Sequence, residues 1–146
     1  FVLATDAVFD SVYDDATARA FLHSHSYTGN ALACRAALAT LDIFQTDHVL
    51  EQNQSRAAKL ALALAPLAQL PHVRHFRQRG MILAFDVNTN DPAFSRRFYR
   101  AALKHEALLR PIGNTVYLMP PYILDDAEIA HLANATQAAL HESYLA

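Results

Sequence analysis

The segment that most restricts the fold is residues 81–87, Met-Ile-Leu-Ala-Phe-Asp-Val, in which every residue except the aspartate is apolar. A short apolar run of this kind is typical of a strand in the middle of a sheet. Val73–Arg79 precedes it, and Gly80 separates the two, which indicates a pair of strands joined by a tight turn. Two more short strands are expected at residues 108–110 and 115–119.

Most of the other apolar residues recur every three or four positions, which is the spacing of a helix with one buried face. Helices are predicted at Asp6–Val12 with an Asp N-cap, at residues 31–44 and at residues 49–70. A further helix is predicted to start at Pro92, and its inner face is expected to carry Phe94, Phe98, Ala101, Ala102 and His105. The last helix is predicted after the capping residues Asp125 and Asp126. Residues 1–5 are expected to end a buried strand. The order after residue 49 predicts an α+β fold, with a small, mainly antiparallel sheet and helices on one side.

Composition excludes several classes of protein. The chain has 146 residues, of which 53% are hydrophobic and 18% charged, so it can bury a core. A formal net charge of -2 with scattered Lys and Arg argues against nucleic acid as a partner, and no apolar run is long enough to cross a membrane. The single Cys34 excludes an internal disulfide, and a cytoplasmic location is expected. The chain starts at Phe1, and we interpret it as a fragment.

Residues 22–30 form a polar segment that opens into a helix. Backbone N–H groups and hydroxyls at a helix start favour an anion, of which phosphate is the common one. A simple loop capped by Thr28 or Asn30 explains the same residues. A metal site at His23 and His25 has no third ligand at a useful spacing, so no metal is expected.

Arg110 and the run 117–122, Tyr-Leu-Met-Pro-Pro-Tyr, are the other candidates. An arginine at the end of an apolar strand can grip a carboxylate with two hydrogen bonds, although a solvated surface arginine fits as well. The two prolines fix a rigid exit from the strand, and the tyrosine hydroxyls serve either packing or ligand contact. No set of nucleophile, base and acid is visible, so the residues alone leave the chemistry open.

Three stretches resemble the class-III aminotransferases that depend on pyridoxal phosphate (PLP). Residues 23–34, HSHSYTGNALAC, are similar to the family segment H-G-x-T-x-x-G-N-P-L-A-C, and residues 73–87 to V-R-x-x-R-G-x-G-L. Residues 108–124, LLRPIGNTVYLMPPYIL, resemble the branch that transfers an amino group from S-adenosylmethionine to 8-amino-7-oxononanoate in biotin synthesis. The resemblance covers the whole chain and corresponds to the C-terminal portion of these enzymes.

The resemblance implies a cytoplasmic, fold-type-I homodimer with its active sites at the dimer interface. PLP forms a Schiff base with a lysine that lies upstream in the family, and neither Lys59 nor Lys104 matches it. The resemblance therefore implies no catalytic residue in this chain, which we expect to be inactive alone. Residues 1–47 are then the tail of the large domain at the dimer interface, and residues 48–146 the small C-terminal domain.

The resemblance also implies four site residues. Ser26 aligns with a threonine that reaches the PLP phosphate of the neighbouring subunit, and His25 beside it is carried over as a second cofactor contact. Arg110 aligns with the arginine that receives the substrate carboxylate, and Tyr117 with a tyrosine of the substrate pocket. This chain departs from the family pattern at three positions: Ser24 replaces the usual Gly, His25 the usual Pro or Ser, and Ala31 the usual Pro. These changes could reshape the phosphate loop.

Two alternatives remain open. One is another class-III ω-aminotransferase that acts on a different amine, and the other is a stand-alone, non-catalytic α+β binding module. A hydrolase or metal site at His23, His25 and Ser26 is a more distant interpretation. In the fragment interpretation the interface surface is exposed apolar area, so poor solubility or self-association is expected.

Overall fold

The computed structural model describes residues 3–23 and 28–145. The chain divides into two compact units, Phe1–Asp42 and Ile43–Ala146. The boundary expected at residues 47 and 48 concerns the domains of a longer protein and stays a prediction. Among the described residues, every buried hydrophobic side chain lies at Ala57 or later, so the core belongs to the second unit. No described helix is both long and apolar enough to cross a lipid bilayer.

The first unit holds α1 (Asp6–Val12), the 3-10 turn η1 (Thr17–Arg19) and most of α2 (Ala31–Thr46). The Asp N-cap predicted for α1 is wrong, because Thr5 occupies that position and its carbonyl accepts the first helical bonds. Residues 3–5 have no strand structure, and residues 1–2 lie outside the described residues. A strand requires a hydrogen-bonded neighbour, and the described residues provide none for 3–5.

The second unit contains an antiparallel sheet of β1 (Val73–Arg79), β2 (Ile82–Val87) and β3 (Thr115–Leu118), in the order β1-β2-β3. The prediction that the apolar run is the central strand is confirmed. The prediction of a fourth strand at residues 108–110 is wrong, because these residues have no strand pairing, and the isolated bridge that follows joins Ile112 to Thr115.

The remaining helices are α3 (Val49–Leu64), α4 (Phe94–Lys104) and α5 (Asp126–Leu145), with the 3-10 segment η2 (Ala65–Gln69) after α3. The helix predicted over 49–70 therefore ends early, where Pro66 lies in the first turn of η2. At the start of α5, Asp125 Oδ1 accepts the Glu128 N–H at 2.8 Å, and Glu128 Oε2 accepts the Asp125 N–H at 2.9 Å. This reciprocal capping fixes where α5 begins.

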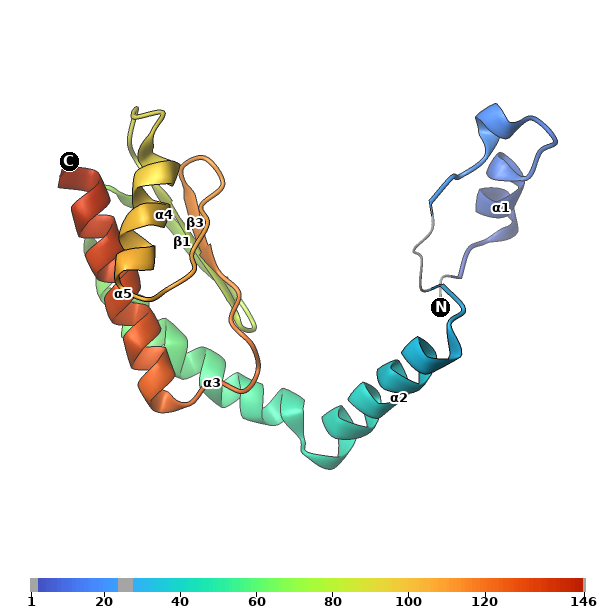
Figure 1. Ribbon diagram of the computed structural model, residues 1–146, viewed down its shortest axis with the longest axis horizontal. Helices are drawn as coiled ribbons and strands as arrows, with labels where there is room; N and C mark the ends of the chain where they lie inside the picture. The colour runs from blue at the N-terminus through green and yellow to red at the C-terminus, as the bar shows by residue number, and fades with distance from the viewer. Residues whose placement is uncertain (1–2, 24–27, 146) are drawn as a thin grey trace. The chain divides into compact units, whose positions relative to one another are not determined.

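The core forms between one face of the sheet and the helices, and α5 packs against both α3 and α4 (Figure 1). Alternate residues of β2 and β3 point into this core, namely Leu83, Phe85, Val87, Val116 and Leu118, together with Phe94 and Phe98 of α4. The opposite face of the sheet carries Ala84, Asp86, Thr115 and Tyr117, all half-buried. This is the predicted α+β arrangement, and its outer sheet face carries one of the candidate site residues.

Candidate functional site

The predicted phosphate loop is described only in part, because Ser26 and His25 lie outside the described residues. Asn30 is the N-cap of α2: its Oδ1 accepts the N–H groups of Leu32 at 2.9 Å and Ala33 at 3.1 Å. The prediction of Asn30 as the N-cap is thereby confirmed, and the choice between a simple capped loop and a phosphate loop stays open. Because the side chain satisfies both of these donors, an anion at this helix would need groups from the loop before Asn30.

Arg110 is exposed and lies between the buried Leu109 and Pro111. It lines a surface hollow of about 580 Å³, together with Pro92, Ser95, Arg96, Tyr99 and Pro111. The Ser95 hydroxyl donates to the Pro111 carbonyl at 2.9 Å, which ties the start of α4 to the segment that carries Arg110. The hollow is thus built by two segments of the second unit that a hydrogen bond holds together.

Tyr117 lies on β3, paired with Ala84 of β2, and its half-buried side chain belongs to the outer sheet face. The segment that carries Arg110 and the strand that carries Tyr117 are joined by one tight turn. In this turn the N–H of Ile112 donates to the Thr115 carbonyl at 2.9 Å, and the N–H of Thr115 donates to the Ile112 carbonyl at 3.0 Å. Tyr117 is not among the residues that line the hollow at Arg110. The structure therefore places the two predicted substrate residues on either side of one turn, but only Arg110 lines the hollow.

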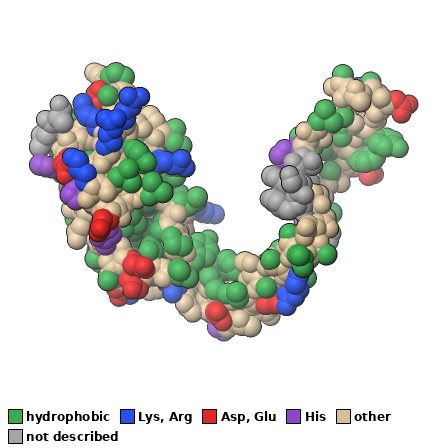
Figure 2. Space-filling view, viewed as in Figure 1, with side chains coloured by type: hydrophobic (Ala, Val, Ile, Leu, Met, Phe, Trp, Pro, Cys, Tyr) green, Lys and Arg blue, Asp and Glu red, His purple; other side chains and the backbone are tan. Residues whose placement is uncertain are grey.

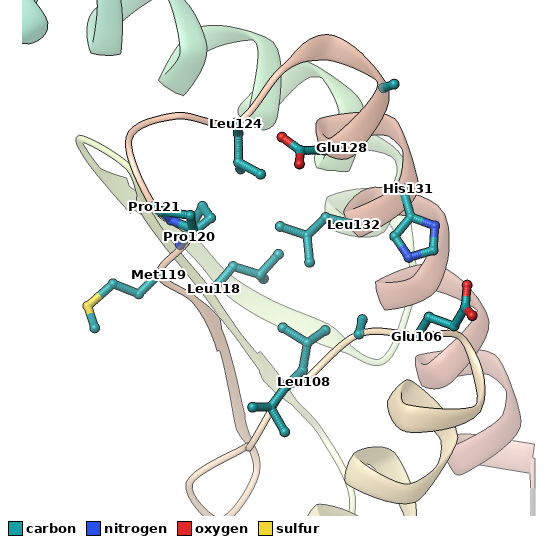
Figure 3. A pocket seen from close by; sticks show the side chains of 13 residues that line it. Glu106, Leu108, Leu118, Met119, Pro120, Pro121, Leu124, Glu128, His131 and Leu132 are labelled. Carbon is teal, nitrogen blue, oxygen red and sulfur yellow. The ribbon is translucent and has the colours of Figure 1, made fainter.

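The two prolines of the 117–122 run line a second, apolar cavity of about 590 Å³ (Figure 3). Leu118, Leu124 and Leu132 surround the opening with them, while Met119 points away from it. Tyr122 packs edge-on against Phe44 with ring centroids 5.9 Å apart. Tyr122 therefore has a packing partner, while ligand contact by Tyr117 stays a prediction.

A cluster around Asp86 was missed by the sequence analysis. Asp86 accepts hydrogen bonds from Thr115 at 2.8 Å and Arg77 at 3.2 Å, and its other oxygen lies 2.8 Å from His75 Nδ1. Partial burial acts to raise the pKa of Asp86, but the bonds to His75, Thr115 and Arg77 outweigh it and hold that pKa below its ordinary value. An aspartate inside an apolar strand was the available signal, since such a group needs partners.

His75 reaches Asp86 because β1 is irregular between Arg74 and Arg77. His75 adopts a left-handed backbone conformation with φ 50°, which is uncommon for a residue with a side chain. An irregularity of this kind inserts a residue into one strand and re-aims its side chain. The regular alternation of side chains along a strand does not predict that His75 lies beside Asp86.

The sequence profile of the class-III aminotransferases matches residues 2–140. This chain therefore belongs to the class-III aminotransferase family. It is 47% identical over 116 residues to the adenosylmethionine-8-amino-7-oxononanoate aminotransferase of Helicobacter pylori, which covers 76% of this chain and 27% of that enzyme. The enzyme of the same name from Methanocaldococcus jannaschii is 34% identical over 153 residues, covering 98% of this chain and 33% of the relative.

Solved structures agree with this assignment. The crystal structure of the Methanocaldococcus jannaschii enzyme superposes with a TM-score of 0.74 at 30% identity, over 94% of this chain and 34% of that one. The omega transaminase of Pseudomonas jessenii in complex with PMP reaches a TM-score of 0.76 at 21% identity, over 86% of this chain and 30% of that one, and shares the fold. The chain thus spans about a third or less of the length of the relatives named here.

The described residues do not fit PLP by themselves. PLP is held covalently by a Schiff base to a lysine, and the two lysines of the described residues each form a surface ion pair. Lys59 Nζ lies 2.6 and 2.8 Å from the two carboxylate oxygens of Asp126, and Lys104 Nζ lies 3.2 Å from Glu142. Within residues 3–23 and 28–145, no three His, Cys, Asp or Glu side chains are grouped as metal ligands would be.

Proposed function

We propose that this chain is the C-terminal part of a PLP-dependent aminotransferase that converts 8-amino-7-oxononanoate to 7,8-diaminononanoate in biotin synthesis, with S-adenosylmethionine as amino donor. The observation that carries the proposal is the 47% identity to the Helicobacter pylori enzyme named for these two substrates. In the whole protein, PLP supplies the amino-transfer chemistry. The residues that hold it covalently belong to the other two thirds of the protein.

Within this proposal, Arg110 binds the carboxylate of the amino acceptor. Its position supports the role: the side chain is exposed and lines a hollow, and no described carboxylate is paired with it. Tyr117 lines the substrate pocket from the outer face of the sheet. Ser26 and His25 bind the phosphate of the cofactor in the neighbouring subunit.

The proposal includes a homodimer in the cytoplasm, with residues 1–47 at the subunit interface and residues 48–146 as the small domain. The exposed apolar side chains of α2 support an interface role. Leu32 is 83% exposed and Leu41 is 64% exposed, and α2 has no buried residue. A helix with this much uncovered apolar surface is typical of a segment that packs against another chain or domain.

A second candidate is an aminotransferase of the same family that uses another amine. An amine transaminase from an uncultivated Pseudomonas species, solved in its PLP-bound form, superposes with a TM-score of 0.71 at 30% identity over 87% of this chain. Arg110 is compatible with this alternative when the acceptor carries a carboxylate. The two candidates differ in amino donor and acceptor.

The proposal is tested with the full-length protein that contains this chain, incubated with PLP and assayed for 7,8-diaminononanoate. Product formation from S-adenosylmethionine and 8-amino-7-oxononanoate is expected. Turnover with a simple amine donor but not with S-adenosylmethionine would establish the second candidate instead.

Borohydride reduction followed by intact-mass measurement tests the location of the lysine. The full-length protein is expected to gain one PLP, whereas the 146-residue chain stays at 16.2 kDa. Specific labelling of the isolated chain at Lys59 or Lys104 would contradict the assignment of the cofactor lysine to the upstream part of the protein.

A further inference from the structure

The hollow at Arg110 holds a second arginine that the proposed function does not use. Arg96 and Tyr99 are three residues apart on α4, so their side chains project from the same side of the helix. Arg110 faces the same hollow from a segment that follows α4 in the chain. Two arginines and a tyrosine therefore line one hollow of about 580 Å³.

The charge of this hollow is not neutralised within the described part of the chain. Asp91 is the acidic residue closest in sequence to the start of α4, and its carboxylate pairs with Arg97 at 2.8 Å. Arg97 in turn donates to the Ser143 carbonyl at 2.9 Å, which holds it on another side of α4. No described carboxylate forms an ion pair with Arg96 or Arg110. In Figure 2, blue side chains gather over the part of the second unit where Figure 1 places α4.

The walls of the hollow determine which anion fits. Pro92, Pro111 and Tyr99 bring apolar groups to the hollow that the two arginines also line. The hydrogen bond between Ser95 and the Pro111 carbonyl fixes the two sides of the hollow relative to each other. Apolar walls next to paired guanidinium groups match an alkyl chain that ends in a carboxylate better than a fully hydrated inorganic anion.

We propose that Arg96, Tyr99 and Arg110 form a single binding site for the carboxylate at the end of an alkyl chain. Arg96 is a specificity-determining residue in this site, and Tyr99 adds a hydroxyl donor. The inference rests on the proposed function only for the role of Arg110. It extends the contact set for an acidic amino acceptor to a second guanidinium on α4.

The test uses the full-length protein with bound PLP and heptanoate as the probe, with binding followed by isothermal titration calorimetry. Arg96→Gln and Arg110→Gln are each expected to weaken heptanoate binding about fivefold or more, since each removes a charge-assisted hydrogen bond. Arg100→Gln is the matched control, because Arg100 is exposed on the same helix and does not line the hollow. It is expected to change the affinity by less than about twofold.

Two further probes test the ligand class. Heptan-1-ol, which lacks the charge, is expected to bind far more weakly than heptanoate. Inorganic phosphate is expected to bind more weakly as well, and binding as tight as that of heptanoate would overturn the assignment to carboxylates. Tyr99→Phe removes only the hydroxyl and is expected to weaken heptanoate binding about twofold to threefold.

The variants separate this inference from the proposed function. If Arg110→Gln weakens binding and Arg96→Gln behaves like Arg100→Gln, the shared site is wrong and the proposed role of Arg110 stands. If only Arg96→Gln weakens binding, both the shared site and the proposed role of Arg110 fail. If heptanoate does not bind to the full-length protein, the site does not exist as proposed, while the transamination assay on the same protein still decides the proposed function.

Discussion

Arg110 is an arginine whose charge is not used within the described structure. A guanidinium without a carboxylate partner retains its full capacity to bind an anionic ligand. In the full-length protein, Arg110→Ala is expected to raise the KM for 8-amino-7-oxononanoate about tenfold or more, from the loss of about 1.5–3 kcal/mol of charged hydrogen bonding. The affinity for PLP is expected to change by less than about twofold.

Steady-state kinetics and a PLP titration measure the two effects. Arg79→Ala is a suitable control, because Arg79 is an exposed arginine at the end of β1 that does not line the hollow. Equal losses of substrate and cofactor affinity in Arg110→Ala would count against the assigned role.

Asp86 is expected to make the stability of the second unit depend on pH. Its pKa in the folded chain lies below the ordinary value of 3.8, so the ionised carboxylate stabilises the folded state. This contribution is fully present above about pH 4 and is lost as the pH falls from there through the lowered pKa. Asp86→Asn should therefore cost about 1 kcal/mol at pH 7, and the difference should shrink as the pH falls below 3.8 through the lowered pKa.

Urea denaturation at pH 7 and at a series of pH values below 3.8 measures this difference. Asp126→Asn is the control, because Asp126 forms an exposed ion pair with Lys59 and an exposed pair contributes little. A pH-independent cost for Asp86→Asn would show that its hydrogen bonds stabilise the fold without linkage to ionisation.

At the scale of elements, the end of α4 offers a test of backbone strain. The N–H of Glu106 donates to the Leu103 carbonyl, and that of Ala107 to the Ala102 carbonyl, which is the pattern of a helix that ends with a left-handed residue. Glu106 has φ 56° at the position where glycine is usual. Glu106→Gly is therefore expected to stabilise the chain by about 1 kcal/mol.

Thermal or urea unfolding measures this change, with Glu106→Ala as the control. Alanine removes the same side-chain charge but keeps the β-carbon, so it should give no comparable gain. A loss of stability in Glu106→Gly would mean that the Glu106 side chain contributes more than the strain it imposes.

The elements that the sequence predicted well are those whose signals are local. Asp125 and Glu128 stand three residues apart, which is the spacing of reciprocal capping, and α5 begins there. The strand predicted at 108–110 failed for an instructive reason. Leu108 is 71% exposed while Leu109 is 6% exposed, so the alternation of a strand is real, but the hydrogen-bonded neighbour is absent. Side-chain alternation does not determine backbone pairing.

The residues of the candidate site also differ in whether a local sequence signal marks them. Arg110 was recognisable as a candidate because it follows an apolar segment and precedes a proline, and its role stays a prediction. Arg96 and Tyr99 carried no signal of their own, because the tie between Ser95 and Pro111 joins segments 16 residues apart in the sequence. The partners of Asp86 depend on an irregular strand, which the sequence pattern does not record.

At the scale of the whole molecule, the uncovered apolar surface is expected to drive self-association of the isolated chain. Leu32, Leu38 and Leu41 of α2 are all more than half exposed. Sedimentation or light scattering of the 146-residue chain should show an average mass that rises with concentration, and Leu32→Glu with Leu41→Glu should reduce that rise. Leu62→Glu is the control, since Leu62 is 77% exposed on α3 of the second unit. A monomer at all concentrations would contradict the expectation.

The absence of buried residues in α2 also sets how quickly its amide protons exchange with deuterium. A helix without tertiary burial opens by local fraying, since packing supplies most helical stability in proteins. In the monomeric chain, α2 amides should therefore exchange orders of magnitude faster than those of α4 around Phe98, which exchange only through larger opening. Protection of α2 that appears only as the chain associates would identify this helix as the part that partner contact stabilises.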